Sequence, residues 1–149
     1  MNEMSYSNMM FRNVVYKEYL DFNIYELDSC VKNFYKLISK EKLVKSGPLI
    51  MVYTQVMKEN RVNIELMLPV DKPLIHRKNL SFRSYLYIEE MLHGRISGED
   101  YESEEKNVLT EIETFSKISK LKRISPYYHI INEVDGLNWI DIKVKVLEQ

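Results

Sequence analysis

An approximate internal repeat constrains the fold of this 149-residue chain more than any other feature. A shift of 78 residues lays Pro48 on Pro126 and brings one run of alternating apolar residues onto another without a gap. The two runs are Val62, Ile64, Leu66 and Leu68 in the first half and Ile140, Ile142, Val144 and Val146 in the second. Because a proline, a loop length and an alternation agree together, the pattern predicts two copies of one supersecondary unit.

The order of elements is the same in both predicted halves. From Phe11 onward, β-branched and aromatic residues indicate a strand, and Asn23 followed by Glu26 has the spacing of a helix N-terminus. Apolar residues at helical spacing follow as far as Ile38, and residues 100–119 have the same character in the second half. We therefore expect an α+β fold of two β-α-β-β repeats with pseudo-twofold symmetry. Its antiparallel sheet should have the helices on one side and a cleft on the other.

The boundaries of these halves follow from the same comparison. Residues 1–10 contain four methionines without a period, so we expect a flexible lead-in there. Residues 11–149 are expected to form a single domain, with half-repeats at about 11–70 and 80–147. The front of each half matches at a shift of 71, Phe11 on Phe82, which predicts an insertion near residues 93–100.

Composition excludes several classes of partner. A net charge of −1 provides no field that gathers phosphates, so we expect no nucleic-acid partner. No apolar run approaches the ~20 residues of a membrane span, so we expect no membrane partner. The one cysteine, Cys30, excludes an internal disulfide and favours a cytoplasmic protein. The histidines lack metal-ligand spacing and no nucleophile elbow or phosphate loop is present, so we expect no metal, no cofactor and no catalytic residues.

Two segments resemble the gyrase-inhibitor-like small-molecule-binding superfamily, which includes multidrug-responsive effector domains. They are Gly47-Pro48 followed by a strand to Tyr53, and Ser125-Pro126-Tyr127-Tyr128-His129-Ile130. The resemblance implies two β-α-β-β halves and an aromatic ligand cleft at their junction. Cation-binding members carry an acidic residue on the late strand, where this chain has His129.

A narrower resemblance is to an uncharacterised bacterial family found beside type VII secretion loci that encode LXG toxins. The residues that carry it are Asn13-Val14-Val15, Ser46-Gly47-Pro48, Leu68-Pro69-Val70 and His93-Gly94-Arg95. This resemblance implies a genomic neighbourhood. It implies no mechanism.

The candidate ligand site lies on the sheet face away from the expected helices. Strand alternation sends Arg83, Tyr85 and Tyr87 to that face, and the repeat places Glu65 on the corresponding face of the first half. Lys143 is the equivalent of Glu65, and the sequence leaves open whether either side chain enters the cleft. The predicted ligand-binding residues are Tyr53, Glu65, Arg83, Tyr85, Tyr87, Tyr128 and His129.

Three functions compete at this point. The leading one is a non-enzymatic module that holds a small apolar or aromatic ligand, or a protein segment, in the central cleft. The second is a secretion-associated accessory protein or chaperone that binds an LXG toxin or another secretion component. The third is a small hydrolase that uses Glu65 and a tyrosine of the cleft.

Overall fold

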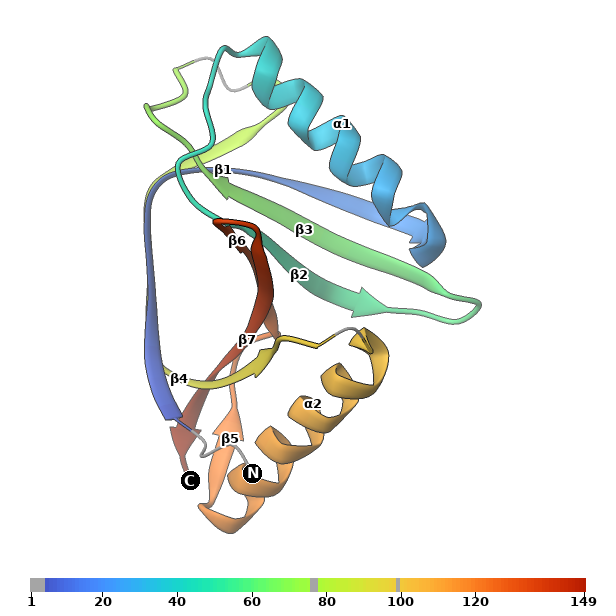
Figure 1. Ribbon diagram of the computed structural model, residues 1–149, viewed down its shortest axis with the longest axis vertical. Helices are drawn as coiled ribbons and strands as arrows, with labels where there is room; N and C mark the ends of the chain where they lie inside the picture. The colour runs from blue at the N-terminus through green and yellow to red at the C-terminus, as the bar shows by residue number, and fades with distance from the viewer. Residues whose placement is uncertain (1–4, 76–77, 99) are drawn as a thin grey trace. The chain divides into compact units, whose positions relative to one another are not determined.

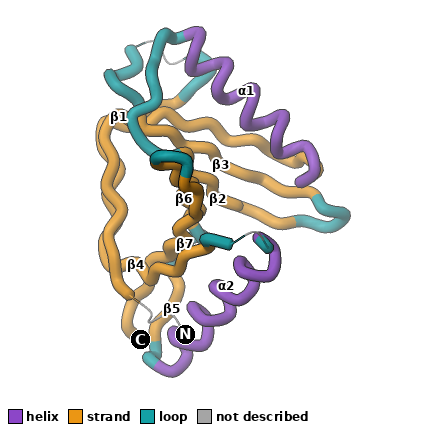
Figure 2. The backbone as a smooth tube through the Cα atoms, in the orientation of Figure 1, coloured by secondary structure: helices purple, strands orange, loops and turns teal. Residues whose placement is uncertain are grey.

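The computed structural model describes residues 5–75, 78–98 and 100–149. They form seven β-strands, two α-helices and one short 3-10 helix, and the strand pairings given below are all antiparallel, so the chain is α+β as expected (Figures 1 and 2). No helix among these residues is both long and apolar enough to cross a membrane. In chain order the elements are β1 (Ser5–Asn23), η1 (Ile24–Glu26), α1 (Leu27–Lys40), β2 (Leu49–Val56), β3 (Arg61–Pro69), β4 (Ser81–Ile96), α2 (Tyr101–Ile118), β5 (Leu121–Arg123), β6 (Tyr128–Val134) and β7 (Leu137–Glu148).

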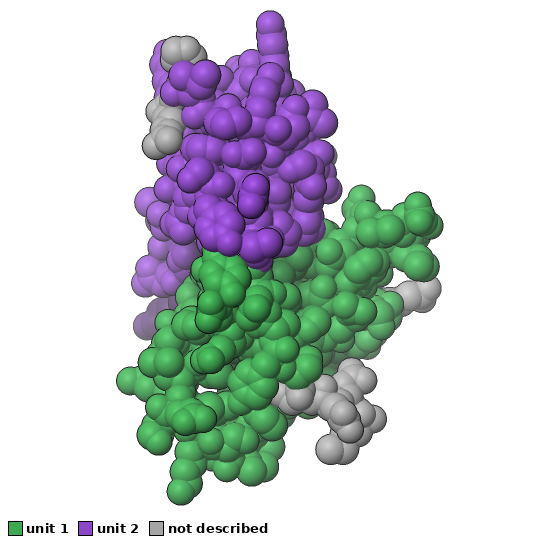
Figure 3. All heavy atoms as spheres, turned by 90° about the vertical axis from the view of Figure 1, so that its left-hand side faces the viewer, with its two compact units in different colours: residues 1–9, 87–149 green, residues 10–86 purple. Residues whose placement is uncertain are grey.

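The chain divides into two compact units, shown in separate colours in Figure 3. Unit 1 comprises residues 1–9 and 87–149, and unit 2 comprises residues 10–86. The division runs through β1 and β4, so each of these long strands contributes to both units. The units therefore match the expected half-repeats only in part.

In unit 2, α1 covers one face of a sheet in which β3 lies between β1 and β2 (Figure 1). Tyr19 of β1 pairs with Ile64 of β3, and its hydroxyl donates a 2.7 Å hydrogen bond to Oδ1 of Asn33 in α1. Directly paired residues of an antiparallel ladder point to the same face. The helix side of this sheet is therefore the face of Ile64 and Leu66, as the alternation predicts. Phe34 of α1 is fully buried.

In unit 1, β7 pairs with β4, β5 and β6. The apolar residues of β7 form one core cluster with the buried residues of α2 and β4, as the alternation in the sequence predicts. The members of this cluster are Leu92, Ile96, Val108, Ile112, Ile140, Ile142, Val144 and Val146.

Gly94 brings β4 close to α2. It pairs with Ile142, so its Cα faces the helix side of the sheet. A Cβ atom at this position would clash with Cγ1 of Val108, so a side chain here would push α2 away from the sheet. Its two neighbours in the chain, His93 and Arg95, point to the opposite face because side chains alternate along a strand.

Both units contain a strand, a helix and a β-hairpin in this order, and unit 1 adds the short β5. The register of the hairpins does not follow the 78-residue shift. Tyr128 pairs with Lys143, but their equivalents Ile50 and Glu65 are not partners, because Ile50 pairs with Met67. The predicted element order is present, whereas the pseudo-twofold symmetry stays a prediction.

The different turns explain the different registers. The β6–β7 hairpin closes through Asp135 and Gly136, both with positive φ, which is the two-residue turn that an Asp-Gly pair favours. The β2–β3 hairpin closes through residues 57–60, and its register shifts between Tyr53 and Gln55. The 78-residue shift assumes loops of equal length in the two halves. It therefore does not reproduce the strand register of both hairpins.

Two boundaries differ from the expected ones. β1 begins at Ser5, so residues 5–10 belong to a strand and not to a lead-in, and residues 1–4 lie outside the described part of the chain. The reason is packing: Met9 is buried and the ring of Tyr6 meets Phe115 edge-on, with their centroids 6.4 Å apart. Residues 93–96, expected within an insertion, are the end of β4 and pair with β7.

The core assignment can be tested at Leu66, which is 0% exposed. Replacing Leu66 by Ala should lower the free energy of unfolding by about 2–5 kcal/mol, because the change removes buried methyl groups and leaves a cavity. A urea titration followed by circular dichroism measures this change. Leu20→Ala is the control, since Leu20 is 63% exposed and should change stability by less than about 0.5 kcal/mol. Equal effects of the two substitutions would contradict the assigned strand face.

Candidate functional site

Unit 2 carries a charged group on the sheet face opposite α1. Glu65 alternates with Leu66 along β3 and is paired with Glu18 of β1. Tyr16 lies two residues before Glu18 on the same face, and the guanidinium carbon of Arg83 lies 4.8 Å from the centroid of its ring. We call this group, Tyr16, Glu18, Glu65 and Arg83, the Glu65 face.

The carboxylate of Glu65 is the distinctive member of this face. Its Oε1 atom is buried and accepts no hydrogen bond from any residue that the structure describes. Burial raises the pKa of the Glu65 carboxyl, the positive charge of Arg83 opposes this rise, and the charge of Glu18 adds to it. A buried acceptor without a donor is costly in the free protein, and a bound molecule that donates a hydrogen bond would remove that cost.

Two other predicted site residues in unit 2, Tyr85 and Tyr53, lie on opposite faces of the sheet. Tyr85 follows Arg83 at the spacing that returns to the same strand face, and its hydroxyl lies 3.0 Å from Sδ of Met10. Tyr53 pairs with Ile64, so it points to the α1 side of the sheet and away from the Glu65 face. Its expected place as a wall beside Glu65 is therefore corrected. Strand facing in β2 is set by its register with β3, which the sequence of β2 does not reveal.

Unit 1 holds a second polar group around Asp141, on the sheet face opposite α2. Asp141 pairs with Arg95 across β4 and β7, and Nε of Arg95 donates to its Oδ1 at 2.9 Å. Nε2 of His93 lies 2.7 Å from the same oxygen. Oδ2 accepts from the Asn132 amide at 3.1 Å and from the Trp139 indole at 3.2 Å. We call these five residues the Asp141 cluster.

The Asp141 cluster satisfies a buried charge. The Asp141 side chain is 12% exposed, and both of its oxygens are hydrogen-bonded to side chains from three strands. Burial alone would raise the pKa of Asp141, but the hydrogen bonds and charges of His93 and Arg95 outweigh it and lower the pKa to about 2. Asp141 is therefore ionised at neutral pH and positions the residues that bind to it.

The remaining predicted residues lie in unit 1. Tyr128 pairs with Lys143, which shares the face of Asp141, so Tyr128 lies on the expected side of the sheet. His129 pairs with Ile142 and points towards α2, where its Nε2 lies 3.0 Å from Oε1 of Glu105. The expected place of His129 on the face away from the helices is therefore corrected. Tyr87 is partly exposed in β4.

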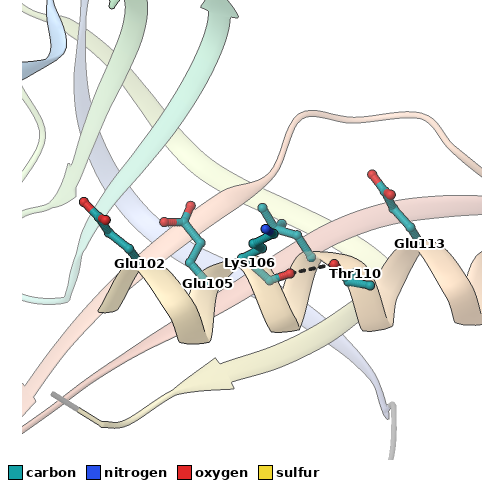
Figure 4. A pocket seen from close by; sticks show the side chains of 6 residues that line it. Glu102, Glu105, Lys106, Thr110 and Glu113 are labelled. Atoms are coloured by element: carbon teal, nitrogen blue, oxygen red, sulfur yellow. Dashed lines mark hydrogen bonds between the residues drawn. The ribbon is translucent and has the colours of Figure 1, made fainter. Parts of the chain in front are cut away.

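A hollow of about 360 Å³ runs along α2 beside Glu105. Figure 4 shows the carboxylates of Glu102, Glu105 and Glu113 pointing to the same side of the helix, with Lys106 between them. Glutamates on one face of a surface helix are commonly solvated.

Metal binding finds no support in the described part of the chain, where no three histidine, cysteine or acidic side chains are placed to hold an ion. The predicted ligand-binding residues do not include the five members of the Asp141 cluster. His93 lies in the expected insertion near residues 93–100 but belongs to β4, and the alternation of His93, Gly94 and Arg95 is the available sign of a strand. The pairing of β4 with β7, which brings these residues together, has no local signal.

Comparisons with known proteins give a family and a fold. A sequence model of the family described as "Domain of unknown function (DUF5085)" matches residues 10–148. No curated protein matches this chain in sequence.

Several solved structures have a similar fold. The EcmrR chain in the cryo-EM structure of an EcmrR–DNA complex gives a TM-score of 0.74 at 9% identity over 98% of this chain. This chain spans only 58% of that EcmrR chain. The crystal structure of the EcmrR C-terminal domain gives 0.68 at 10% identity, covering 99% of this chain and 98% of that domain. A structure described as a hydrolase from Listeria innocua gives 0.56 at 11% identity, covering 95% and 91% of the two chains. At these identities the likeness shows the fold alone.

The pKa shift of Glu65 predicts a pH-dependent stability. Because the pKa is raised in the folded state, the wild-type protein should lose stability as the pH rises from 4.5, the ordinary value, through the raised pKa. Glu65→Gln should remove this loss, so the variant should gain stability relative to the wild type over that range and not below it. Denaturant titrations at a series of pH values measure the difference. A difference that is constant with pH would contradict the assignment.

Asp141 should show the opposite dependence. Its pKa is lowered from 3.8 to about 2, so its stabilisation is present above 3.8 and is lost as the pH falls through about 2. At neutral pH, Asp141→Asn should lower the free energy of unfolding by about 1–3 kcal/mol, because it removes the negative charge and replaces one of the two acceptor oxygens by an NH2 group that faces other donors. Asp28→Asn is the control, since it changes an exposed ion pair worth less than about 1 kcal/mol. Thermal and denaturant unfolding measure both variants. If Asp141→Asn and Asp28→Asn lowered stability equally, the described network would be contradicted.

Proposed function

The chain belongs to the family described as a domain of unknown function, DUF5085, and we propose that it acts as a small-molecule-binding module whose ligand contacts Glu65. The observation that carries this proposal is the buried Oε1 atom of Glu65, which has no donor among the described residues. Such an atom costs about 1–3 kcal/mol when left unsatisfied. An unsatisfied buried group in a folded protein calls for an explanation, and a bound molecule that donates the missing hydrogen bond is the one we propose.

The charges near Glu65 indicate the class of ligand. Two carboxylates, Glu65 and Glu18, face one guanidinium, that of Arg83, so the Glu65 face has an excess negative charge when both are ionised. Tyr16 lies beneath Arg83 and adds an aromatic surface. A molecule with an amino group on an apolar or aromatic body fits this arrangement, because the ammonium donates hydrogen bonds and balances the charge.

Fold likeness supports a binding module in general terms. The fold is that of the EcmrR C-terminal domain, and the gyrase-inhibitor-like resemblance of residues 47–53 and 125–130 implies a ligand-binding role. Tyr85, which lies in unit 2 with Glu65 and Arg83, is proposed as a further contact of the ligand. Its ring adds aromatic surface at low entropic cost.

A second candidate function is binding of a protein segment, including an LXG toxin or another component of type VII secretion. The exposed apolar side chains that such binding would use include Tyr25, Val56 and Leu137, each more than half exposed. A hydrolase that uses Glu65 is the enzymatic alternative. A raised pKa suits a general acid, which is the role that Glu65 would have in such an enzyme.

The proposal can be tested with benzylamine and its neutral analogue benzyl alcohol as probes, in NMR titrations of the full chain. The wild-type protein should bind benzylamine more tightly than benzyl alcohol. Glu65→Gln should weaken benzylamine binding about tenfold or more, since a hydrogen bond to a charged group contributes roughly 1.5–3 kcal/mol.

Glu59→Gln is the matched control, because it makes the same charge change in the exposed turn between β2 and β3. It should change the affinity by less than about twofold, as an exposed charge contributes little. Equal weak responses of the wild type and Glu65→Gln would remove the small-molecule proposal and favour protein binding. Conversion of an ester such as benzyl acetate, lost in Glu65→Gln, would instead identify a hydrolase.

A further inference from the structure

The Asp141 cluster in unit 1 has an arrangement suited to an anion, and we infer that Arg95 and its neighbours bind the carboxylate of a small organic molecule. The Asp141 cluster belongs to unit 1 and the Glu65 face to unit 2, and the inference does not rest on the proposed function. It is carried by the orientation of Arg95 and by the charges of the side chains around it.

Arg95 is held on two sides. Its Nε donates to Oδ1 of Asp141, and its guanidinium carbon lies 5.4 Å from the centroid of the Trp139 ring. Neither terminal nitrogen, Nη1 or Nη2, has a hydrogen-bond partner among the described residues, and the side chain is 54% exposed. A guanidinium restrained in this way loses little entropy on binding and presents two parallel N–H donors, the geometry that matches a carboxylate.

The charged side chains on this strand face have an excess of one positive charge when all are ionised, which one bound anion would balance. Asp141 is the carboxylate of the cluster, and Arg95 and Lys143 are two cations on the same strand face. The Nε2 atom of His93 is already engaged by Oδ1 of Asp141. Burial lowers the pKa of Lys143, the charge of Asp141 raises it and the charge of Arg95 lowers it further. A bound monoanion would neutralise the excess charge and would favour the ionised lysine.

Asp141 acts here as a positioning residue. With Oδ1 it restrains Arg95 and His93, and with Oδ2 it restrains Asn132 and the Trp139 indole. These donors come from β4, β6 and β7, so the guanidinium is attached to a rigid sheet. A flexible arginine on a loop would lack this pre-organisation.

Trp139 supplies a direct reporter, because it is the chain's one tryptophan and its indole N–H belongs to the cluster. The experiment is a titration of the full chain with butyrate, followed by the indole N–H signal in NMR spectra. Chloride at equal ionic strength and inorganic phosphate form the comparison arms. We expect a saturable shift with butyrate, no saturable shift with chloride, and weaker binding of phosphate.

Variants assign the effect to Arg95. Arg95→Gln and Arg95→Lys should each weaken butyrate binding about tenfold or more, because both remove the paired N–H donors. Arg95→Lys retains the positive charge, so it separates the effect of the paired donors from the effect of the charge. Arg123→Gln is the matched control. Arg123 also lies over an aromatic ring in unit 1, that of Tyr127 at 5.0 Å, but outside the Asp141 cluster. Its affinity for butyrate should stay within about twofold of the wild type.

Three results would overturn the inference. They are a butyrate response equal to the chloride response, an Arg95→Lys variant that binds butyrate like the wild type, and phosphate binding tighter than butyrate binding. Retained dispersion in the NMR spectrum of each variant shows that it is folded. Because butyrate and the Arg95 variants differ from the probes and variants used for Glu65, failure of one proposal is distinguishable from failure of the other.

Discussion

The rest of the structure depends on the packing of one helix against one face of each sheet. Alternating side chains of β3 and β7 place Leu66 and Val144 on the helix side, where both are fully buried. Each buried aliphatic side chain contributes roughly 1.5–3 kcal/mol, so this orientation is strongly preferred over the reverse. Glu65 alternates with Leu66 along β3, and Asp141 and Lys143 alternate with the apolar residues of β7, so these three must lie on the other face. The charged groups of both units are a consequence of that packing.

The two carboxylates on these faces differ because their donors differ. Asp141 accepts hydrogen bonds from side chains on three strands, and its pKa is lowered to about 2. Glu65 has one guanidinium nearby and a buried oxygen without a donor among the described residues, and burial raises its pKa. A satisfied carboxylate suits a structural, positioning role, whereas an unsatisfied one suits contact with a ligand. This contrast leads to the different roles that we propose for Glu65 and for Arg95.

Gly94 connects the core of unit 1 to its polar cluster. It allows β4 to approach Val108 of α2, and the same alternation that turns Gly94 to the helix turns His93 and Arg95 to Asp141. Of these three consecutive residues, Gly94 allows the helix to pack against β4, and His93 and Arg95 make the polar contacts with Asp141. A substitution at Gly94 would disturb both, because any displacement of β4 from α2 also moves the donors of Asp141.

The sequence by itself determined the local elements, because capping and side-chain periodicity act within a few residues. Asn23 caps the first helical turn through a 2.9 Å bond from the Tyr25 amide, and the alternating runs 62–68 and 140–146 are the central parts of β3 and β7. Only the tertiary structure decided which strands pair and in which register. That choice places Tyr53 on the α1 side and brings His93 and Asp141 within hydrogen-bond distance across β4 and β7. Such contacts join residues far apart in the chain, and the energy that selects them comes from packing of the whole unit, which no local pattern records.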